Sequence, residues 1–524
     1  MRRYLCLLLG LLLCMGAKAQ GISPDIDVTQ LRKLQMVQLA VASLYVDTVD
    51  QKALAEDAIR GMLEKLDPHS LYSTPEETKK LTEPLDGNFD GIGVQFNLLD
   101  DTLVVIQTVH KGPSEKVGIR SGDRIVMVNG EAIAGVKMAR DSIVSRLRGP
   151  KGTHAVLKVV RRGVSEPIVF DVVRDKIPLN TLDAAYMLRP GVGYIRLESF
   201  GASTGDEVRT ALRKLKKDGM RDLVLDLQDN GGGYLGAAVE VASEFLKGGD
   251  LVVYTKGRAA EPQNFYANAG GLFREGRLIV LVDELTASAA EIVSGAIQDY
   301  DRGRIVGRRT FGKGLVQRPI PLPDDSMVRL TTAHYYTPSG RCIQKPYEKG
   351  KKEEYGQDIE ERYKHGELLN RDSIHLDSAQ VFYTLVERRQ VFGGGGIMPD
   401  VFVPLDTTTY SKYFIALRRV NAFNEVSLKY TDNNRSRLLK TYPTAAEFIA
   451  GFEVPDALVE EAETFGHDKK VEPADEAERE RTLDDVRFFL KGLILYDLFD
   501  RSAYFQFFNQ RSDVVKKALE LLDT

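Results

Sequence analysis

The stretch that decides the fold is Arg277-Leu-Ile-Val-Leu-Val-Asp283-Glu-Leu-Thr-Ala-Ser288-Ala-Ala-Glu-Ile-Val-Ser-Gly295. Its first part, residues 278–282, is an unbroken apolar run, which is typical of a strand buried on both faces. From Ala289 onward the apolar residues recur at helical spacing. The stretch therefore predicts a buried strand followed by a helix, with Ser288 at the junction.

Two interpretations of Ser288 follow from this position. The unpaired N–H groups and the positive dipole end at a helix start can stabilise an alkoxide or a developing oxyanion, which makes Ser288 a candidate nucleophile. Ser288-Ala-Ala-Glu291 is equally a capping box, and capping is the commoner use of serine at a helix start. The segment alone favours the cap and leaves both interpretations open.

Composition and charge exclude several classes of protein. The 524 residues have room for about three domains of roughly 150 residues each. A hydrophobic content of 43% and a charged content of 28% are those of an ordinary globular protein. A net charge of -4 provides no general attraction to nucleic acid, so we expect no nucleic-acid partner.

Residues 1–19 predict a secretory signal peptide. A basic pair precedes an apolar run over residues 4–15, and Ala17-Lys18-Ala19 follows, so we expect cleavage after Ala19. The run is too short to span a membrane, and no later stretch reaches about 18 apolar residues. Leu13 is too bulky for the position before Cys14 in a lipoprotein signal. We therefore expect an exported, periplasmic protein without a membrane span.

The cysteine and histidine pattern gives no sign of a disulfide bond or a metal site. After signal cleavage the chain retains only Cys342, so it has no internal disulfide. No cluster of cysteine or histidine has metal-ligand spacing. We expect no metal and no cofactor.

Changes of hydrophobic period divide the chain after the signal peptide into four regions. Residues 20–80 are helical, residues 81–175 are strand-rich with Gly and Asn-Gly turns, and residues 176–405 alternate strands with helices. Residues 406–524 form a second helical region. The alternation over residues 176–405 predicts an α/β core with a mostly parallel sheet.

Two apolar segments need a partner surface. The N-terminal helices are amphipathic and have no strands around them, so their apolar faces pack against the rest of the chain or a second copy. Residues 486–499 are also strongly apolar. One interpretation of these two segments is that they form the interface of a homodimer.

Lys313 and Gln317 are the residues that could activate Ser288. A helix, a short strand and a turn separate Ser288 from Lys313, and they can return the chain to the start of the helix. A lysine acts as a general base only when burial lowers its pKa by several units from about 10.4. Gln317 could hold the amine by a hydrogen bond without adding a charge that would raise this pKa.

A glycine loop upstream could supply oxyanion donors. Asp226-Leu-Gln-Asp-Asn230-Gly231-Gly232-Gly233 follows a buried strand, and its glycines can present backbone N–H groups without side-chain obstruction. With the Ala289 N–H, such a group would complete a two-donor oxyanion hole. A phosphate-binding glycine loop and a plain turn are the alternatives.

The strand-rich region resembles a PDZ domain. Gly91-Ile92-Gly93-Val94 is similar to the carboxylate-binding loop of that domain, Gly112–Ile119 to its small helix, and Gly122-Asp123-Arg124-Ile125 to the next strand. N–H groups of such a loop capture a C-terminal carboxylate while the peptide adds a strand to the sheet. The alternative is that these glycines only make turns.

Together these segments resemble the C-terminal processing peptidases, also called tail-specific proteases. The resemblance covers about residues 67–404 and is carried by Thr286-Ala-Ser-Ala-Ala-Glu291, Gly312-Lys-Gly314, Gln317 and the glycine loop. It implies an α/β protease core carrying an inserted PDZ-like β domain, between N- and C-terminal helical regions. By family analogy alone, an adaptor or lipoprotein partner is a further implication.

The resemblance also assigns roles to the site residues. It implies a Ser–Lys endopeptidase with Ser288 as nucleophile, Lys313 as general base and Gln317 as the residue that orients the lysine. Gly232 and Ala289 become the oxyanion donors. Two positions depart from the family pattern: Gln228 replaces an expected arginine, and Cys342 replaces a small hydroxyl residue.

Three rival interpretations are weaker. The segment 307–314 nearly spells a phosphate-binding loop, but Gly314 lacks the hydroxyl for magnesium and a strand-like segment follows where a helix is required. A histidine-based triad would need His334, which lies in a strand-like segment. A catalytically idle PDZ scaffold would have no need of Ser288, Lys313 and Gln317 together. We therefore predict an exported protease that recognises exposed apolar C-terminal tails of proteins and cleaves them.

Overall fold

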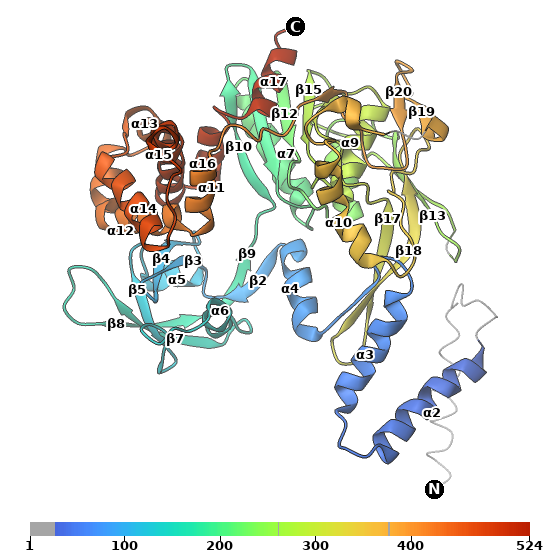
Figure 1. Cartoon of the computed structure of the whole chain (residues 1–524), viewed down its shortest axis with the longest axis horizontal. Coiled ribbons are helices and arrows are strands. Elements are labelled where there is room, and N and C mark those ends of the chain that lie inside the picture. Colours follow the sequence, from blue (N-terminus) through green and yellow to red (C-terminus); the bar gives the residue numbers. More distant parts are fainter. Residues whose placement is uncertain (1–26, 260, 376–377) are drawn as a thin grey trace.

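The computed structural model describes residues 27–259, 261–375 and 378–524 (Figure 1). The predicted signal peptide lies outside these residues. Within them, no helix is long and apolar enough to cross a membrane.

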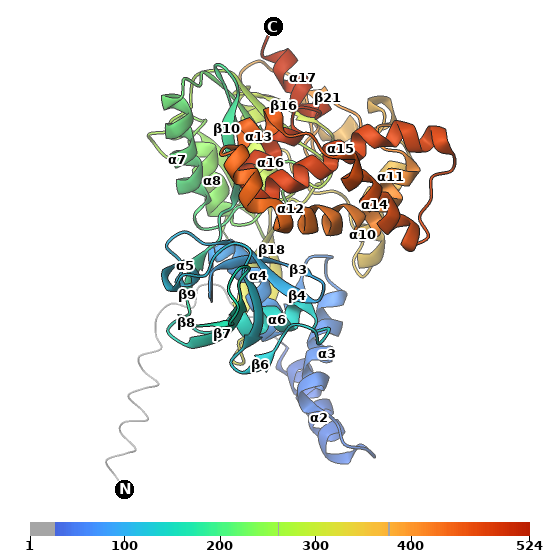
Figure 2. The ribbon, with the colours of Figure 1, turned by 90° about the vertical axis from the view of Figure 1, so that its left-hand side faces the viewer.

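The N-terminal helices extend away from the rest of the molecule (Figures 1 and 2). They are α2 (Val28–Leu44) and α3 (Gln51–Glu64), and the Asp27 and Asp50 side chains cap their first turns. Along α2 no side chain is buried, and large apolar side chains are exposed, among them Leu31, Leu34, Met36, Val37 and Leu39. The residues that the structure describes therefore leave the apolar face of α2 without cover. β1 (Leu71–Ser73) and α4 (Pro75–Asp86) follow.

The PDZ-like region is a sheet around its own apolar core. The sheet order is β3 (Val94–Leu99), β4 (Thr102–Thr108), β5 (Arg124–Val128), β7 (His154–Val160) and β8 (Ile168–Val173), with β6 (Glu131–Ala132) beside β5. Outside it lie β2 (Asn88–Gly91), β9 (Asp175–Pro178), α5 (Pro113–Val117) and α6 (Arg140–Leu147). Because β3 is at the edge of the sheet, its outer side is open to an added strand.

The core sheet confirms the predicted parallel α/β arrangement. Its order is β10 (Leu182–Arg189), β11 (Val192–Leu197), β12 (Asp222–Asp226), β15 (Leu278–Val282), β16 (Arg304–Gly307) and β21 (Val401–Phe402). All neighbours are parallel except β10 and β11. All five residues of β15 are buried, as the apolar run predicts. The connecting helices are α7 (Thr204–Lys217), α8 (Leu235–Ser243) and α9 (Ala289–Asp299).

A second, antiparallel sheet lies beside this core. It contains β1, β18 (Met327–Tyr336), β13 (Leu251–Lys256) and β14 (Gln263–Tyr266), with β17 (Leu315–Pro321) paired to β18. The remaining elements before the helical region are α10 (Lys352–Lys364), the short 3₁₀ turns Arg371–Ser373 and Ser378–Gln380, β19 (Val381–Tyr383) and β20 (Gln390–Phe392).

The C-terminal helical region has an apolar core of its own. Its helices are α11 (Lys412–Arg419), α12 (Ala422–Thr441), α13 (Ala445–Gly451), α14 (Asp456–Asp468), α15 (Glu476–Leu498), α16 (Arg501–Phe508) and α17 (Asp513–Leu521). Leu490, Ile494 and Leu495 of α15 are fully buried in this core. The interpretation of residues 486–499 as a dimer surface is therefore wrong, because packing within the region already covers this run.

The same helical region contacts both other parts of the molecule (Figure 2). Toward the PDZ-like sheet, Asp432 pairs with Arg124 at 2.6 Å and with Arg162 at 3.0 Å. Toward the core, Arg501 pairs with Asp183 at 2.7 Å, and α17 packs on β15 and β16. The expected arrangement of an α/β core, a PDZ-like β domain and flanking helical regions is thus confirmed.

Candidate active site

Ser288 lies between β15 and α9 in a strained backbone conformation. Its φ of 56° and ψ of -115° belong to a region that glycine favours. A non-glycine residue in such a region costs on the order of 1–3 kcal/mol, and residues of this kind cluster at functional sites. The predicted capping box is present, and within it the Ser288 N–H donates to Glu291 Oε2 at 2.8 Å. The strain goes beyond what a simple cap requires.

Glu291 joins the segment of Ser288 to the segment of Lys313. Its side chain is fully buried, and it also accepts from Gly312 N–H and Lys313 N–H at 2.8 Å each and from Thr310 Oγ1 at 2.5 Å. Burial raises the pKa of this carboxyl, and these donors oppose the shift. The sequence interpretation gave Glu291 only a capping role. The tertiary role is visible only once the two segments are placed side by side.

Tyr335 makes a second connection between the same segments. Its buried hydroxyl donates to the Ser288 carbonyl at 3.0 Å and lies 2.5 Å from the Lys313 carbonyl. Nothing in the local pattern of β18 marks this tyrosine as part of the site. Its contacts fix the backbone on which both candidate catalytic side chains stand.

Lys313 combines burial with a neutral partner. Its Nζ donates to Gln317 Oε1 at 3.0 Å. Burial, and secondly the nearby charge of Arg329, lower the pKa of Lys313 to about 8, against the opposing charges of Glu291 and Asp67. A lysine with this pKa has a sizeable neutral fraction near neutral pH, as a general base requires.

Gln317 is itself held in place by the turn that precedes β1. Its Nε2 donates to the His69 carbonyl. Asp67 fixes this turn by accepting from His69 N–H at 2.9 Å, from Ser70 N–H at 3.1 Å and from Thr331 Oγ1 at 2.9 Å. Sequence reasoning missed this support for the lysine, because it depends on contacts between distant segments.

The two predicted oxyanion donors lie beside Ser288 but differ in availability. A Cβ added at Gly232 would lie 2.8 Å from Ala289 N and from Ser288 Cβ, so only glycine fits here. The Gly232 N–H donates to Asn230 Oδ1 at 2.8 Å. The Ala289 N–H, at the first position of α9, has no acceptor among the described residues. Gly232 can therefore act as a donor only if its bond to Asn230 opens or is shared.

Ser288, Lys313 and Gln317 line one cavity of about 350 Å³. No hydrogen bond joins Ser288 to the Lys313 amine in the described part of the chain. Apolar side chains form much of the wall: Leu81, Leu85, Ile292, Leu315, Pro319 and Met327. Arg329 also lines it, and its Nε is buried without a partner among the described residues. The cavity can therefore receive an apolar side chain next to the serine.

The predicted tail-binding residues form the connection between β2 and β3. Gly91 ends β2, Val94 begins β3, and Gly93 has a φ of 73°, which glycine adopts without strain. The Ile92 carbonyl accepts from Ser114 N–H and Oγ, at 3.1 and 2.7 Å, so α5 supports the loop. The arrangement leaves the loop at the start of the open sheet edge.

The rival sites have no support in the geometry. The segment after Gly314 is strand β17, so the helix that a phosphate-binding loop requires is missing there. His334 lies in β18, with Nδ1 3.9 Å from Cys342 Sγ, and does not line the cavity of Ser288. Gln228 is the other departure from the family pattern. Its N–H donates to Asp226, and Asp226 pairs with Arg196 at 2.8 Å.

Comparison with family models agrees with this organisation. Peptidase family S41 matches residues 191–351, a PDZ domain matches residues 91–169, and the activating protease CtpB N-terminal domain matches residues 16–78. A family of unknown function, DUF8443, matches residues 413–500.

Named relatives fall in the same group. A carboxy-terminal-processing protease of Bartonella bacilliformis is 38% identical over 309 residues, which are 58% of this chain and 70% of that protein. The carboxy-terminal processing protease CtpB of Bacillus subtilis is 32% identical over 316 residues, 60% of this chain and 65% of the relative. Among solved structures, the photosystem II D1 C-terminal processing protease has 27% identity, covers 75% of this chain and 91% of its own, and has a TM-score of 0.35.

The protein is therefore a serine-type endopeptidase with a PDZ domain. It belongs to the carboxy-terminal processing proteases of peptidase family S41.

Proposed function

We propose that this protein is an exported endopeptidase that binds the C-terminal tails of proteins through a PDZ-like domain at residues 81–175 and cleaves them in a core at residues 176–405. The observation that carries the proposal is the buried Lys313 amine, held by neutral Gln317 in the same cavity as Ser288. The predicted signal peptide at residues 1–19 supports export.

The reaction follows from these positions. Ser288 Oγ attacks the scissile carbonyl and its proton passes to Lys313 Nζ, while Ala289 N–H and, once freed, Gly232 N–H stabilise the oxyanion. The C–N bond then breaks, and the lysine returns the proton to the leaving amine. A water activated by Lys313 hydrolyses the acyl-enzyme. Because the resting cavity lacks a Ser288–Lys313 hydrogen bond, substrate binding has to bring the two groups together.

The test of the dyad is cleavage of an unfolded protein with an apolar tail. We expect Ser288→Ala and Lys313→Ala each to lower kcat by about 10³-fold or more, with unchanged unfolding curves. Lys349→Met, at an exposed lysine outside the cavity, should keep full activity. Full activity in Lys313→Ala would disprove the dyad, whereas a parent protein that binds tails without cleaving them would favour the idle scaffold.

The test of the tail-binding loop uses the substrate. A peptide ending in a free carboxylate should be cleaved faster than its amidated form if Gly91, Ile92, Gly93 and Val94 bind the carboxylate. Equal rates for the two forms would remove that role.

A homodimer through α2 is part of the same proposal. The uncovered apolar side chains of this helix would pack on the α2 of a second copy. Replacing Leu34 and Val37 by glutamate should convert a dimer to a monomer in analytical ultracentrifugation. A dimer that survives both changes would place the interface elsewhere.

A further inference from the structure

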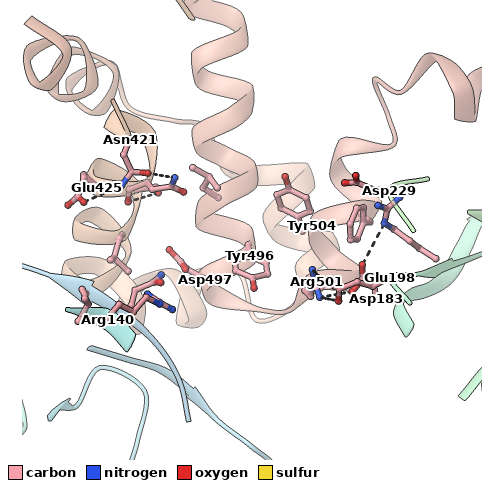
Figure 3. A pocket seen from close by; sticks show the side chains of 18 residues that line it. Arg140, Asp183, Glu198, Asp229, Asn421, Glu425, Tyr496, Asp497, Arg501 and Tyr504 are labelled. Atoms are coloured by element: carbon pink, nitrogen blue, oxygen red, sulfur yellow. Dashed lines mark hydrogen bonds and ion pairs between the residues drawn. The ribbon is translucent and has the colours of Figure 1, made fainter. Parts of the chain in front are cut away.

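A second cavity, of about 820 Å³, lies where three regions of the chain meet (Figure 3). We call it the junction cavity. Asn97 and Leu98 of β3 and Arg140 of α6 line it from the PDZ-like side, and Asp229 lines it from the glycine loop beside Ser288. Helices α12, α15 and α16 of the C-terminal region form most of the remaining wall, and Asp183, Arg196 and Glu198 of the core complete it. The cavity thus touches both the edge strand of the PDZ-like sheet and the loop of the active site.

Asp497 is the unusual residue of this cavity. It is 7% exposed and lines the cavity from the last turn of α15, where the negative end of the helix dipole disfavours a further anion. Its carboxylate accepts no hydrogen bond from the described residues; Arg435 donates to its backbone carbonyl, at 2.9 Å. Burial raises the pKa of Asp497 to about 7, which Arg435 partly opposes. A buried carboxyl in such a place gains from an external cation.

Two other carboxylates of the cavity are paired with an arginine. Asp183 and Glu198 pair with Arg501 at 2.7 and 2.6 Å, as the dashed lines of Figure 3 show. Arg140 lies over the Phe96 ring, with Cζ 4.8 Å from the ring centroid. Among the described residues the Asp497 carboxylate therefore has no ion pair, since the nearby Arg435 donates to its backbone carbonyl instead.

The junction cavity lies along the course that a bound tail would follow. A peptide that adds antiparallel to β3, with its carboxylate at residues 91–94, runs upstream past Asn97 and Leu98. At about 3.3 Å per residue, tail residues roughly four to six positions before the C-terminus reach the cavity. From the cavity, the bound peptide continues toward Asp229 and the glycine loop.

We propose that the junction cavity is a substrate subsite in which Asp497 binds a basic side chain, lysine or arginine, located upstream of the tail's terminal carboxylate. This inference rests on the proposed function, because it needs a tail bound along β3. It also assigns a role to the C-terminal helical region, which supplies Asp497 and most of the wall.

The experiment measures kcat/KM for the full mature chain on peptides that share one apolar, acid-ended C-terminus. Lysine is moved through positions about three to seven from that end, and each peptide is compared with its methionine counterpart. We expect lysine to be favoured about tenfold at one position. Asp497→Asn should reduce this ratio to about one. Asp484→Asn, the same change at an exposed position of α15, should preserve it.

A charge reversal gives an independent readout. In Asp497→Lys the preferred residue at that position should change from lysine to glutamate. If either variant loses cleavage altogether, fluorescence anisotropy with the same peptides on Ser288→Ala and Ser288→Ala/Asp497→Asn proteins measures the ratio without catalysis. The subsite is disproved if the parent protein shows no preferred position, or if Asp497→Asn keeps the preference.

Amidated versions of the same peptides separate this inference from the proposed function. A preference for the free acid without a preference for lysine disproves the subsite alone. Equal rates for acid and amide with a retained lysine preference disprove the carboxylate loop and support the subsite.

Discussion

The catalytic cavity and the junction cavity touch the same glycine loop, yet each handles a buried ionisable group differently. Lys313 has a neutral hydrogen-bond partner, Gln317, and can shed its proton at moderate pH. Asp497 has no side-chain partner in the described chain, and a bound cation would stabilise its charge. The partner of a buried ionisable group therefore decides its use. A neutral partner suits a group to proton transfer, and the lack of a partner suits a group to binding an opposite charge.

The largest effect is expected from breaking the connection that organises the catalytic cavity. In Glu291→Gln a carboxamide replaces a buried carboxylate that accepts from Ser288, Gly312, Lys313 and Thr310, and its NH₂ group faces donors instead of accepting from them. We expect a loss of about 3 kcal/mol in the free energy of unfolding and a fall of about 100-fold or more in kcat. Denaturant unfolding and peptide cleavage measure the two quantities.

The matched control for this variant is Glu275→Gln, at an exposed glutamate outside the site. It should leave both quantities unchanged. Normal stability and normal kcat in Glu291→Gln would show that the two segments are positioned without this carboxylate.

The pH dependence of cleavage sharpens the contrast between the cavities. Below a pKa of about 8, Lys313 holds its proton and cannot act as a base, so kcat/KM should rise about tenfold per pH unit up to that point and then level off. In Arg329→Gln a nearby cation is lost, the ammonium form of Lys313 becomes less unfavourable, and the acid limb should move to higher pH by about half a unit to one unit.

Arg318→Gln, an exposed arginine on the neighbouring strand β17, is the control and should leave the pH profile unchanged. A profile that stays in place in Arg329→Gln would mean that burial alone sets the pKa of Lys313.

A smaller effect is expected where α12, which also lines the junction cavity, meets the PDZ-like sheet. Asp432→Asn weakens the pairs with Arg124 and Arg162 that hold α12 on the PDZ-like sheet. Because Arg162 is largely exposed, we expect a loss of only about 1–2 kcal/mol. Hydrogen exchange in β5 and α12 should become faster. Cleavage of tails with a basic residue should fall by about two- to fivefold. Unchanged exchange would show that apolar packing alone holds the contact.

Much of the fold was predictable because it depends on local pattern. The apolar run of β15 and the helical spacing after Ser288 predicted the strand-to-helix junction, and the order of glycine turns predicted the PDZ-like sheet. Hydrophobic period and turn chemistry are properties of neighbouring residues, so they can be identified in the sequence without the tertiary structure. Bringing Lys313 and Ser288 to one cavity also agrees with the expected return of the chain.

Other features depended on contacts between distant residues. The sequence allowed residues 486–499 to be a dimer surface, and only the packing of α15 showed that this run is already covered. The amide of Gly232 was free in the sequence interpretation, whereas in the structure it donates to Asn230. A linear pattern shows which groups are available but not which partners they meet.

By itself, then, the amino-acid sequence determined the strand, helix and turn order, the family and the candidate residues Ser288, Lys313 and Gln317. Only the tertiary structure decided how those residues are supported, through the buried Glu291 and the carbonyl of His69. It also decided that the Asp497 carboxylate lines the junction cavity without an ion pair among the described residues. The physical reason is that burial and partnership of a charged group are set by segments far apart in the chain. These are the same quantities that set its pKa and its function.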